Sequence, residues 1–149
     1  MFTGVSIINL DAKGRIAIPS KYRDELQSCC NGRLVLTIHP DRCLLLYPFP
    51  EWEKVQHSLL ERSNLDPQVR KLQRLVMGYA EDMEMNPQGR ILITGPLRKF
   101  AGLDKQIAFV GQGTKFELWD AAAWDRQTEE FLADEDNFAF NEAIEGLSL

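Results

Sequence analysis

One stretch of the chain occurs twice, and this internal repeat constrains the fold more than any other feature of the sequence. "LDAKGRIAIP" (Leu10–Pro19) returns 75 residues later as "MNPQGRILIT" (Met85–Thr94). The pairs aligned at this offset are Gly14 with Gly89, Arg15 with Arg90, Ile16 with Ile91, Ile18 with Ile93, and Arg23 with Arg98. Self-similarity at a fixed spacing indicates two copies of one structural unit.

The repeat continues at an offset of 72, where Leu46 meets Leu118, Tyr47 meets Trp119, and Trp52 meets Trp124. Both halves read as strand, turn, strand, short helix, two strands, and a helix that begins with an aromatic residue. A chain of 149 residues suits two such halves. Because a lone domain of about 70 residues is marginally stable, we expect the halves to share one core.

The pattern predicts an α+β fold, mostly β. We expect a first unit at residues 5–50, linking helices at 51–80, a second unit at 81–125, and an acidic C-terminal helix or tail at 126–149. The first helix of the link begins at Pro50, with Leu60 among its inward residues, and the second is capped by Asp66. Ser20 is predicted to cap the short helix of the first unit, and 83–85 to form a strand.

The two Gly-Arg segments have the residues of a type I turn. Asp11 and Asn86 stand at the first position, where the side chain can bond the backbone, and Gly14 and Gly89 stand at the last. Turn geometry alone therefore explains these four residues. It does not call for the arginine that follows each glycine.

Arg15 and Arg90 each stand where the turn enters an apolar strand. A guanidinium there can bind a phosphate or the edge of a guanine. The alternative is an ion pair with a carboxylate of the same chain. Two arginines at one repeat position favour a shared ligand face.

Charge is distributed unevenly. The net charge of −5 divides into +4 for residues 1–116 and −9 from Glu117 onward, where ten acidic residues accompany one basic residue. The first 23 residues carry a local +3 from Lys13, Arg15, Lys21 and Arg23 against Asp11. A basic face of this kind can attract nucleic acid although the whole chain is acidic.

Several classes of protein are disfavoured. The chain lacks metalloprotease, nucleophile-elbow and Walker motifs, so we expect neither an enzyme nor a cofactor nor a small-molecule substrate. Gly111-Gln112-Gly113 has no following helix and reads as a hairpin turn instead of a nucleotide loop. Three cysteines without zinc spacing, no signal peptide and no apolar run of about 20 residues predict a cytoplasmic protein without a membrane segment.

Four segments together resemble a known family: "NLDAKGRIAIPSKYRDEL", "LLLYPFPEWE", "QRLVMGYAEDMEMNPQGRILITGPLRKFAGL" and "GQGTKFELWDAAAW" are similar to the bacterial MraZ proteins. The resemblance implies a tandem pair of AbrB-like swapped-hairpin units forming a β-barrel with flanking helices. It implies a repressor that binds short direct repeats in promoter DNA upstream of the division and cell wall gene cluster, including its own gene. It also implies a homo-oligomeric ring and association with the nucleoid.

The family contacts DNA through D-x-x-x-R turns. The first motif is intact here from Asp11 to Arg15, whereas Asn86 replaces the acid of the second, which ends at Arg90. With the neighbouring basic residues, the predicted DNA-binding set is Arg15, Lys13, Asp11, Gly14, Lys21, Arg23, Arg90, Gly89, Asn86 and Arg98. Arg15 is expected to read a base and Lys13 to hold a phosphate. For Arg23 and Arg98, ion pairs on a helix surface or between chains are the alternative.

A non-catalytic scaffold is the competing function. AbrB-like units also occur in antitoxins that wrap a toxin with a tail, and the acidic segment after Ala133 could do this or cover the basic face. The internal duplication argues against an antitoxin, because a single antitoxin unit dimerises to build what this chain builds alone.

Overall fold

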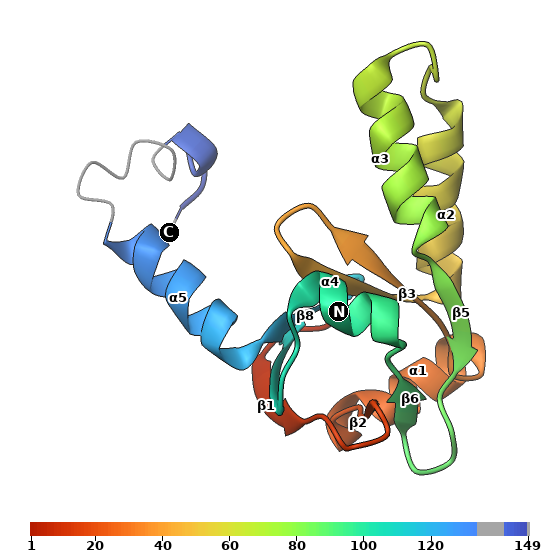
Figure 1. Ribbon diagram of the computed structural model, residues 1–149, viewed down its shortest axis with the longest axis vertical. Helices are drawn as coiled ribbons and strands as arrows, with labels where there is room; N and C mark the ends of the chain where they lie inside the picture. The colour runs from red at the N-terminus through yellow and green to blue at the C-terminus, as the bar shows by residue number, and fades with distance from the viewer. Residues whose placement is uncertain (134–141, 149) are drawn as a thin grey trace.

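The computed structural model of the protein describes residues 1–133 and 142–148 (Figure 1). Over these residues the strands are β1 Val5–Asn9, β2 Arg15–Ala17, β3 Arg33–His39, β4 Cys43–Pro48, β5 Glu81–Glu84, β6 Arg90–Leu92, β7 Gln106–Gly111 and β8 Phe116–Asp120. The helices are α1 Ser20–Cys30, α2 Phe49–Glu61, α3 Pro67–Gly78, α4 Gly95–Ala101 and α5 Ala121–Leu132. The fold is α+β and mostly sheet, which confirms the predicted class.

Six strands form one antiparallel sheet in the order β1-β7-β8-β4-β3-β5. β1 of the first half pairs with β7 of the second, and β5 of the second half pairs with β3 of the first. The remaining strands, β2 and β6, pair with each other as a separate two-stranded ribbon. Each half is therefore completed by a strand of the other half, as expected for a tandem swapped fold.

The inner face of the sheet and the ribbon enclose a single apolar core to which both halves contribute. The first half supplies Ile16, Ile18, Leu26, Leu36 and Leu46, and the second supplies Ile91, Ile93, Leu97, Phe109 and Phe116, all of them buried. Aromatic rings of both halves meet in it, with the ring centroids of Tyr22 and Phe116 4.9 Å apart. The two halves thus share one core, as the marginal size of each half predicts.

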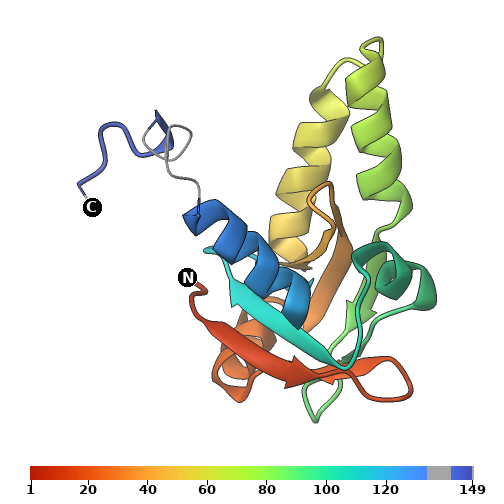
Figure 2. The same ribbon diagram turned by 60° about the vertical axis from the view of Figure 1, so that its left-hand side comes forward.

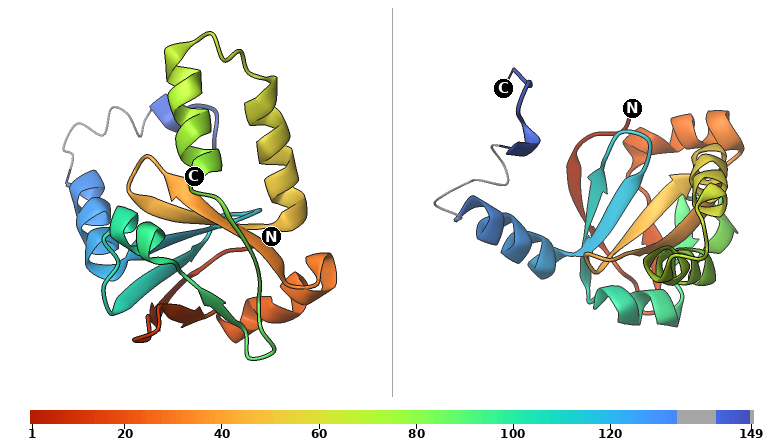
Figure 3. Two further views of the ribbon diagram at one scale, coloured as in Figure 1. Left: turned by 45° about the vertical axis from the view of Figure 1, so that its right-hand side comes forward. Right: turned by 90° about the horizontal axis from the view of Figure 1, so that it is seen from above.

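Helices cover the outer face of the sheet at two separate places. The α2–α3 hairpin projects from β3 and β4, and α5 projects from β8 (Figures 2 and 3). Beneath the hairpin, Val35, Tyr47, Trp52 and Val76 form a buried cluster, and the buried hydroxyl of Thr37 donates to the Val76 carbonyl. The tip of the hairpin and the two Gly-Arg turns lie at opposite ends of the molecule (Figures 1 and 2).

Most element boundaries agree with the predictions, and four details were wrong. α2 begins at Phe49 instead of the predicted Pro50. Ser20 is the first helical residue of α1 and makes no capping hydrogen bond; Pro19 is the N-cap residue. Leu60 was predicted to face inward, but its exposed fraction is 62% because it lies on the solvent side of α2. The strand predicted at 83–85 is shifted, since β5 begins at Glu81 and ends at Glu84.

The predicted cap of α3 is confirmed, and α5 has a cap of the same kind. The Asp66 carboxylate accepts from the Gln68 backbone N–H at 2.8 Å, and that of Asp120 accepts from the Ala123 N–H at 3.2 Å. The domain boundaries drawn from the sequence stay predictions. Within the predicted acidic tail, residues 126–132 belong to α5, and residues 134–141 and 149 lie outside the described residues.

Candidate nucleic-acid interface

The first Gly-Arg segment is a tight turn held by the side chain of its first residue. The Gly14 N–H donates to the Asp11 carbonyl at 3.0 Å, which closes the turn. One carboxylate oxygen of Asp11 accepts from the backbone N–H groups of Lys13 and Arg15, each at 2.9 Å. The left-handed backbone of Gly14, with φ of 83°, is open to glycine at little cost. The predicted turn is confirmed.

The second segment repeats this geometry with an amide in place of the carboxylate. The Gly89 N–H donates to the Asn86 carbonyl at 2.8 Å. The side-chain oxygen of Asn86 accepts from the N–H groups of Gln88 at 3.0 Å and Arg90 at 2.8 Å. Asn therefore serves this turn as well as Asp does, because only an acceptor oxygen is needed.

A local twofold relationship connects the two turns. In the β2–β6 ribbon Ile16 lies opposite Ile91, while Arg15 lies opposite Leu92 and Ala17 opposite Arg90. The contact of Arg15 with Leu92 is thus repeated, at the other end of the ribbon, by that of Arg90 with Ala17. The ribbon is symmetric about an axis that passes between the two isoleucines. The isoleucines point into the core, and alternation along a strand places the four flanking residues on the outer face.

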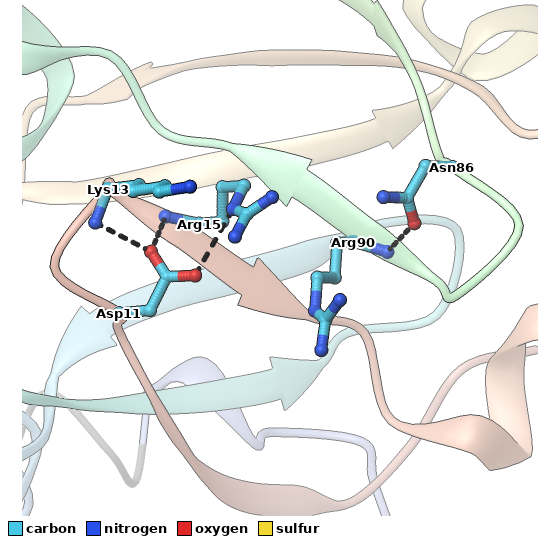
Figure 4. A network of polar contacts seen from close by, with 5 residues as sticks. All are labelled: Asp11, Lys13, Arg15, Asn86 and Arg90. Atoms are coloured by element: carbon cyan, nitrogen blue, oxygen red, sulfur yellow. Dashed lines mark hydrogen bonds and ion pairs between the residues drawn. The ribbon is translucent and has the colours of Figure 1, made fainter.

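The outer face of the ribbon carries the two arginines close together. Arg15 and Arg90 occupy diagonal positions across the antiparallel pair, where neighbours are separated by about 7–8 Å. Figure 4 shows both side chains between the two turns, which lie at opposite ends of the ribbon. The structure therefore places on one face of the ribbon two arginines that are 75 residues apart in sequence.

Arg15 is tethered to its own turn. Its Nε donates to the second carboxylate oxygen of Asp11 at 3.2 Å, and both side chains are only partly exposed to solvent. Hydrogen bonds from the backbone N–H of Arg15 and, to a lesser degree, of Lys13 lower the pKa of the Asp11 carboxyl below its ordinary value of 3.8. The intramolecular ion pair considered as an alternative for Arg15 is therefore present, and it leaves the terminal nitrogens of the guanidinium unused among the described contacts.

Arg90 is exposed and has no such tether. Within residues 1–133 and 142–148, no hydrogen bond or ion pair of its guanidinium is found, because Asn86 bonds only the backbone of its turn. Lys13 lies in the first turn with an exposed side chain near Arg15 (Figure 4). Lys21 lies elsewhere, with its Nζ 5.0 Å from the centre of the Tyr22 ring.

Comparison with known proteins agrees with this duplicated site. The family model described as MraZ protein, antitoxin-like, matches the chain twice, at residues 1–75 and 76–144. The chain belongs to the MraZ family. The boundary between the two matches lies between the two Gly-Arg turns. Each match therefore contains one turn.

Relatives of similar length carry the family name. A protein named Transcriptional regulator MraZ from Thioalkalivibrio sulfidiphilus is 53% identical over 150 residues, which cover all of both chains. Proteins of the same name from Nitrosomonas eutropha and Nitrosomonas europaea are 52% identical over 100% of both chains and 54% identical over 87% of both chains. Membership of this family supports transcriptional regulation as the general role of the chain.

Arg23 and Arg98 occupy places that the sequence did not predict. The Nε of Arg23 donates to the Ile18 carbonyl at 2.8 Å, and Nη1 of Arg98 donates to the Ile93 carbonyl. Neither forms an ion pair within the part of the chain that the structure describes. Both arginines are half-buried beside a turn of the other half. Only the repeat offset of 75 indicated that they are equivalent.

Two histidines and a buried cysteine lie outside the ribbon and its turns. His39 accepts from the Asp41 N–H at 3.0 Å within its turn, and His57 lies 2.9 Å from Glu61 on the exposed side of α2. Burial raises the pKa of the Cys43 thiol to about 12, so it is protonated at neutral pH. None of the described helices is long and apolar enough to cross a membrane.

Proposed function

We propose that the protein is a sequence-specific regulator of transcription that binds double-stranded promoter DNA with the outer face of the β2–β6 ribbon and the two turns beside it. The observation that carries this proposal is the pair of arginines on the outer face of the ribbon, half-buried at Arg15 and exposed at Arg90, which are related by the local twofold axis and have terminal nitrogens without a partner in the described residues. The family membership and the names of the relatives support it.

The chemistry of the ribbon suits the major groove of DNA. That groove admits a two-stranded ribbon, and an arginine can bind the O6 and N7 atoms of guanine with two parallel hydrogen bonds. The strand positions of Arg15 and Arg90, about 7–8 Å apart at the backbone, are separated by roughly two base-pair steps of 3.4 Å. Arg15 thus reads a base in the proposed complex, and Arg90 reads or contacts DNA a short distance away.

The rest of the proposed interface holds the backbone of the DNA. Lys13, in the turn beside Arg15, binds a phosphate, and Lys21 adds positive charge from α1. The two turns are shaped by Asp11, Gly14, Asn86 and Gly89. Arg23 and Arg98 lie beside these turns in the proposed interface. Phosphate contacts of this kind fix the register of the protein on DNA without selecting a sequence.

One chain offers too few contacts to bind tightly alone. Four to six phosphate contacts give salt-sensitive affinities near the non-specific range of about 10⁻⁴–10⁻⁶ M. Linking several chains can raise the apparent affinity by about 10²–10⁴ through effective concentration. We therefore propose a closed homo-oligomeric ring, whose head-to-tail contacts present successive chains in one rotational sense and suit direct repeats in the DNA.

The proposed target follows the family resemblance. It consists of short direct repeats upstream of the division and cell wall gene cluster, where the protein acts as a repressor of these genes and of its own. Repeats about ten base pairs apart would meet successive chains on one side of the duplex. In the cell the protein would then be cytoplasmic and associated with the nucleoid.

Binding of purified protein to the DNA upstream of its own gene tests the proposal directly. Fluorescence anisotropy at a stated salt concentration would compare this duplex with a scrambled duplex of equal length and composition. Arg15→Ala should remove about 1–3 kcal/mol of discrimination between the two duplexes, because one bidentate base contact is lost. Lys13→Ala should weaken binding to both duplexes and make the salt dependence shallower by about 0.9 per lost phosphate contact.

A matched control removes an equal charge far from the ribbon. Lys71 is exposed on α3, and the α2–α3 hairpin projects away from the turns, so Lys71→Ala should leave the discrimination unchanged (Figure 1). If Arg15→Ala retained the discrimination of the parent protein, the proposed role of Arg15 would be wrong. If the parent protein bound both duplexes equally at every salt concentration, the DNA-reading function itself would be wrong.

A protein-binding function is the second candidate, and the antitoxin-like description of the family model favours keeping it. A scaffold would bind a protein partner and treat promoter and scrambled DNA alike. The same anisotropy measurement separates the two candidates, because only a reader of DNA distinguishes the duplexes.

A further inference from the structure

Two arginines outside the ribbon lie against the turns in a crossed arrangement. Arg23 belongs to α1 of the first half, and its repeat equivalent Arg98 belongs to α4 of the second. A Cβ atom placed on Gly14 would lie 2.1 Å from Nη1 of Arg98, and one placed on Gly89 would lie 2.2 Å from Nε of Arg23. Each guanidinium therefore lies against the glycine of the opposite half.

The hydrogen bonds follow the same crossed pattern. The Ile18 N–H donates to the Gly89 carbonyl and the Ile93 N–H donates to the Gly14 carbonyl, both at 2.8 Å. The carbonyl groups of these same two isoleucines accept from Arg23 and Arg98, respectively. Arg23 thus holds the backbone to which the second turn is anchored, and Arg98 holds the backbone that anchors the first.

We propose that Arg23 and Arg98 are crossed positioning residues: Arg98 fixes the turn that carries Arg15, and Arg23 fixes the turn that carries Arg90. The geometry of each reading turn then depends on the other half of the chain. The packing part of this proposal concerns the free protein alone, and its consequence for DNA rests on the proposed function above.

The residue types explain why both positions need arginine and glycine together. A guanidinium is flat and presents its donors in one plane, so it can lie on a peptide backbone and still bond a carbonyl beside it. Lysine has a point charge and lacks this shape. A Cβ atom on either glycine would occupy the space of the guanidinium, in addition to straining a backbone with φ of 83° or 76°.

Thermal denaturation of the free protein tests the crossed contact without DNA. Gly14→Ala should lower Tm more in the parent protein than in an Arg98→Ala background, because the conflict with the guanidinium disappears while the backbone strain and the contact of the Cβ atom with the Ile93 carbonyl oxygen at 3.0 Å stay. The pair Gly89→Ala and Arg23→Ala should behave in the same way. Residues in contact give non-additive effects, whereas separated residues add.

The chain supplies its own matched controls, namely the same-half pairs 14 with 23 and 89 with 98. These pairs should be additive in Tm. Additive effects in the crossed pairs, or equal coupling in the same-half pairs, would overturn the proposal whatever the result with DNA. If an alanine variant of either glycine does not fold, hydrogen exchange answers the question instead: Arg98→Ala should speed exchange at residues 11–15 more than at 86–90, and Arg23→Ala should do the reverse.

DNA binding then separates positioning from direct phosphate contact. Arg98→Ala should weaken promoter binding by about tenfold or less while the slope of affinity against salt stays within about 0.3 of the parent value, since no phosphate contact is removed. Arg98→Lys keeps the charge and should not restore the affinity. A salt slope shallower by about 0.9, together with full rescue by lysine, would instead assign Arg98 to a phosphate and overturn its positioning role.

Discussion

The two turns have the same backbone hydrogen bonds but differ in the contacts that their first residue makes with the arginine. Asp11 bonds the backbone of its turn with one oxygen and holds Arg15 with the other. Asn86 bonds the same backbone positions but leaves the Arg90 guanidinium without a partner in the described residues. An ordered side chain loses less entropy on binding than a free one. The comparison therefore indicates that Arg15 is prepared for one contact geometry, while Arg90 can adapt to several.

The two halves also differ in how completely their helices cover the sheet. Trp52 of α2 is 5% exposed, and its ring centroid lies 5.8 Å from that of Tyr47. Its repeat equivalent, Trp124 of α5, is half-buried, with a similar centroid distance of 5.9 Å to Trp119. The same aromatic pair is thus more deeply covered in the first half, where α3 joins α2.

The largest expected effect tests the difference in burial between the two aromatic pairs. Trp52→Ala should reduce the free energy of unfolding by about 3–5 kcal/mol, because a large buried side chain leaves a cavity. Trp124→Ala should cost clearly less, because its side chain already contacts solvent. Urea denaturation of both variants checks the difference, and equal losses would contradict the conclusion that the first half is better covered.

The next prediction concerns the twofold axis, where the halves should be alike. Ile16 and Ile91 are 1% and 3% exposed and face each other across the ribbon. Replacing either isoleucine by alanine should lower the free energy of unfolding by about 2–5 kcal/mol. The loss should be nearly the same in the two variants. A large inequality in the urea midpoints would show that the two units contribute unequally to the shared core.

Exchanging the first residues of the turns tests whether the tether of Arg15 affects the preference for promoter DNA. Asp11→Asn should release Arg15 and lower the preference for promoter over scrambled DNA by a factor of about five or less, since an exposed ion pair is worth about 0–1 kcal/mol. Asn86→Asp should tether Arg90 and change the preference by no more than this. Anisotropy with both duplexes measures the ratio, and a larger loss from Asn86→Asp would reverse the assigned roles.

The smallest effect is a dependence on pH confined to the first turn. Because the pKa of Asp11 is lowered in the folded protein, its contribution to stability is present above the ordinary value of 3.8 and is lost as the pH falls through the lower folded value. The difference in unfolding free energy between the parent protein and Asp11→Asn should therefore shrink below about pH 3.8. A difference that stays constant down to about pH 3 would contradict the assignment.

Sequence reasoning reached the duplicated architecture because repeats and turns are local signals. The offset of 75 and the residues Asp11, Gly14, Asn86 and Gly89 determined both turns and their place at the start of a strand. The helix cap at Asp66 was equally readable. These features depend on residues a few positions apart, so the pattern of letters contains them.

The crossed contacts could not be read in this way, because they depend on how the halves meet. Nothing in the sequence near Arg98 indicates that its guanidinium lies against Gly14, 84 positions earlier. The exposed position of Leu60 was missed for a related reason, since the side of α2 that faces inward is set by its contacts with the sheet and α3. Long-range packing decided these details against local expectation.

The exchange of β1 and β5 between the halves has a consequence for how this site can evolve. In an assembly of two identical chains, a mutation would alter both corners at once. Here the two corners are encoded separately within a single polypeptide, so position 86 can carry an amide while position 11 carries a carboxylate.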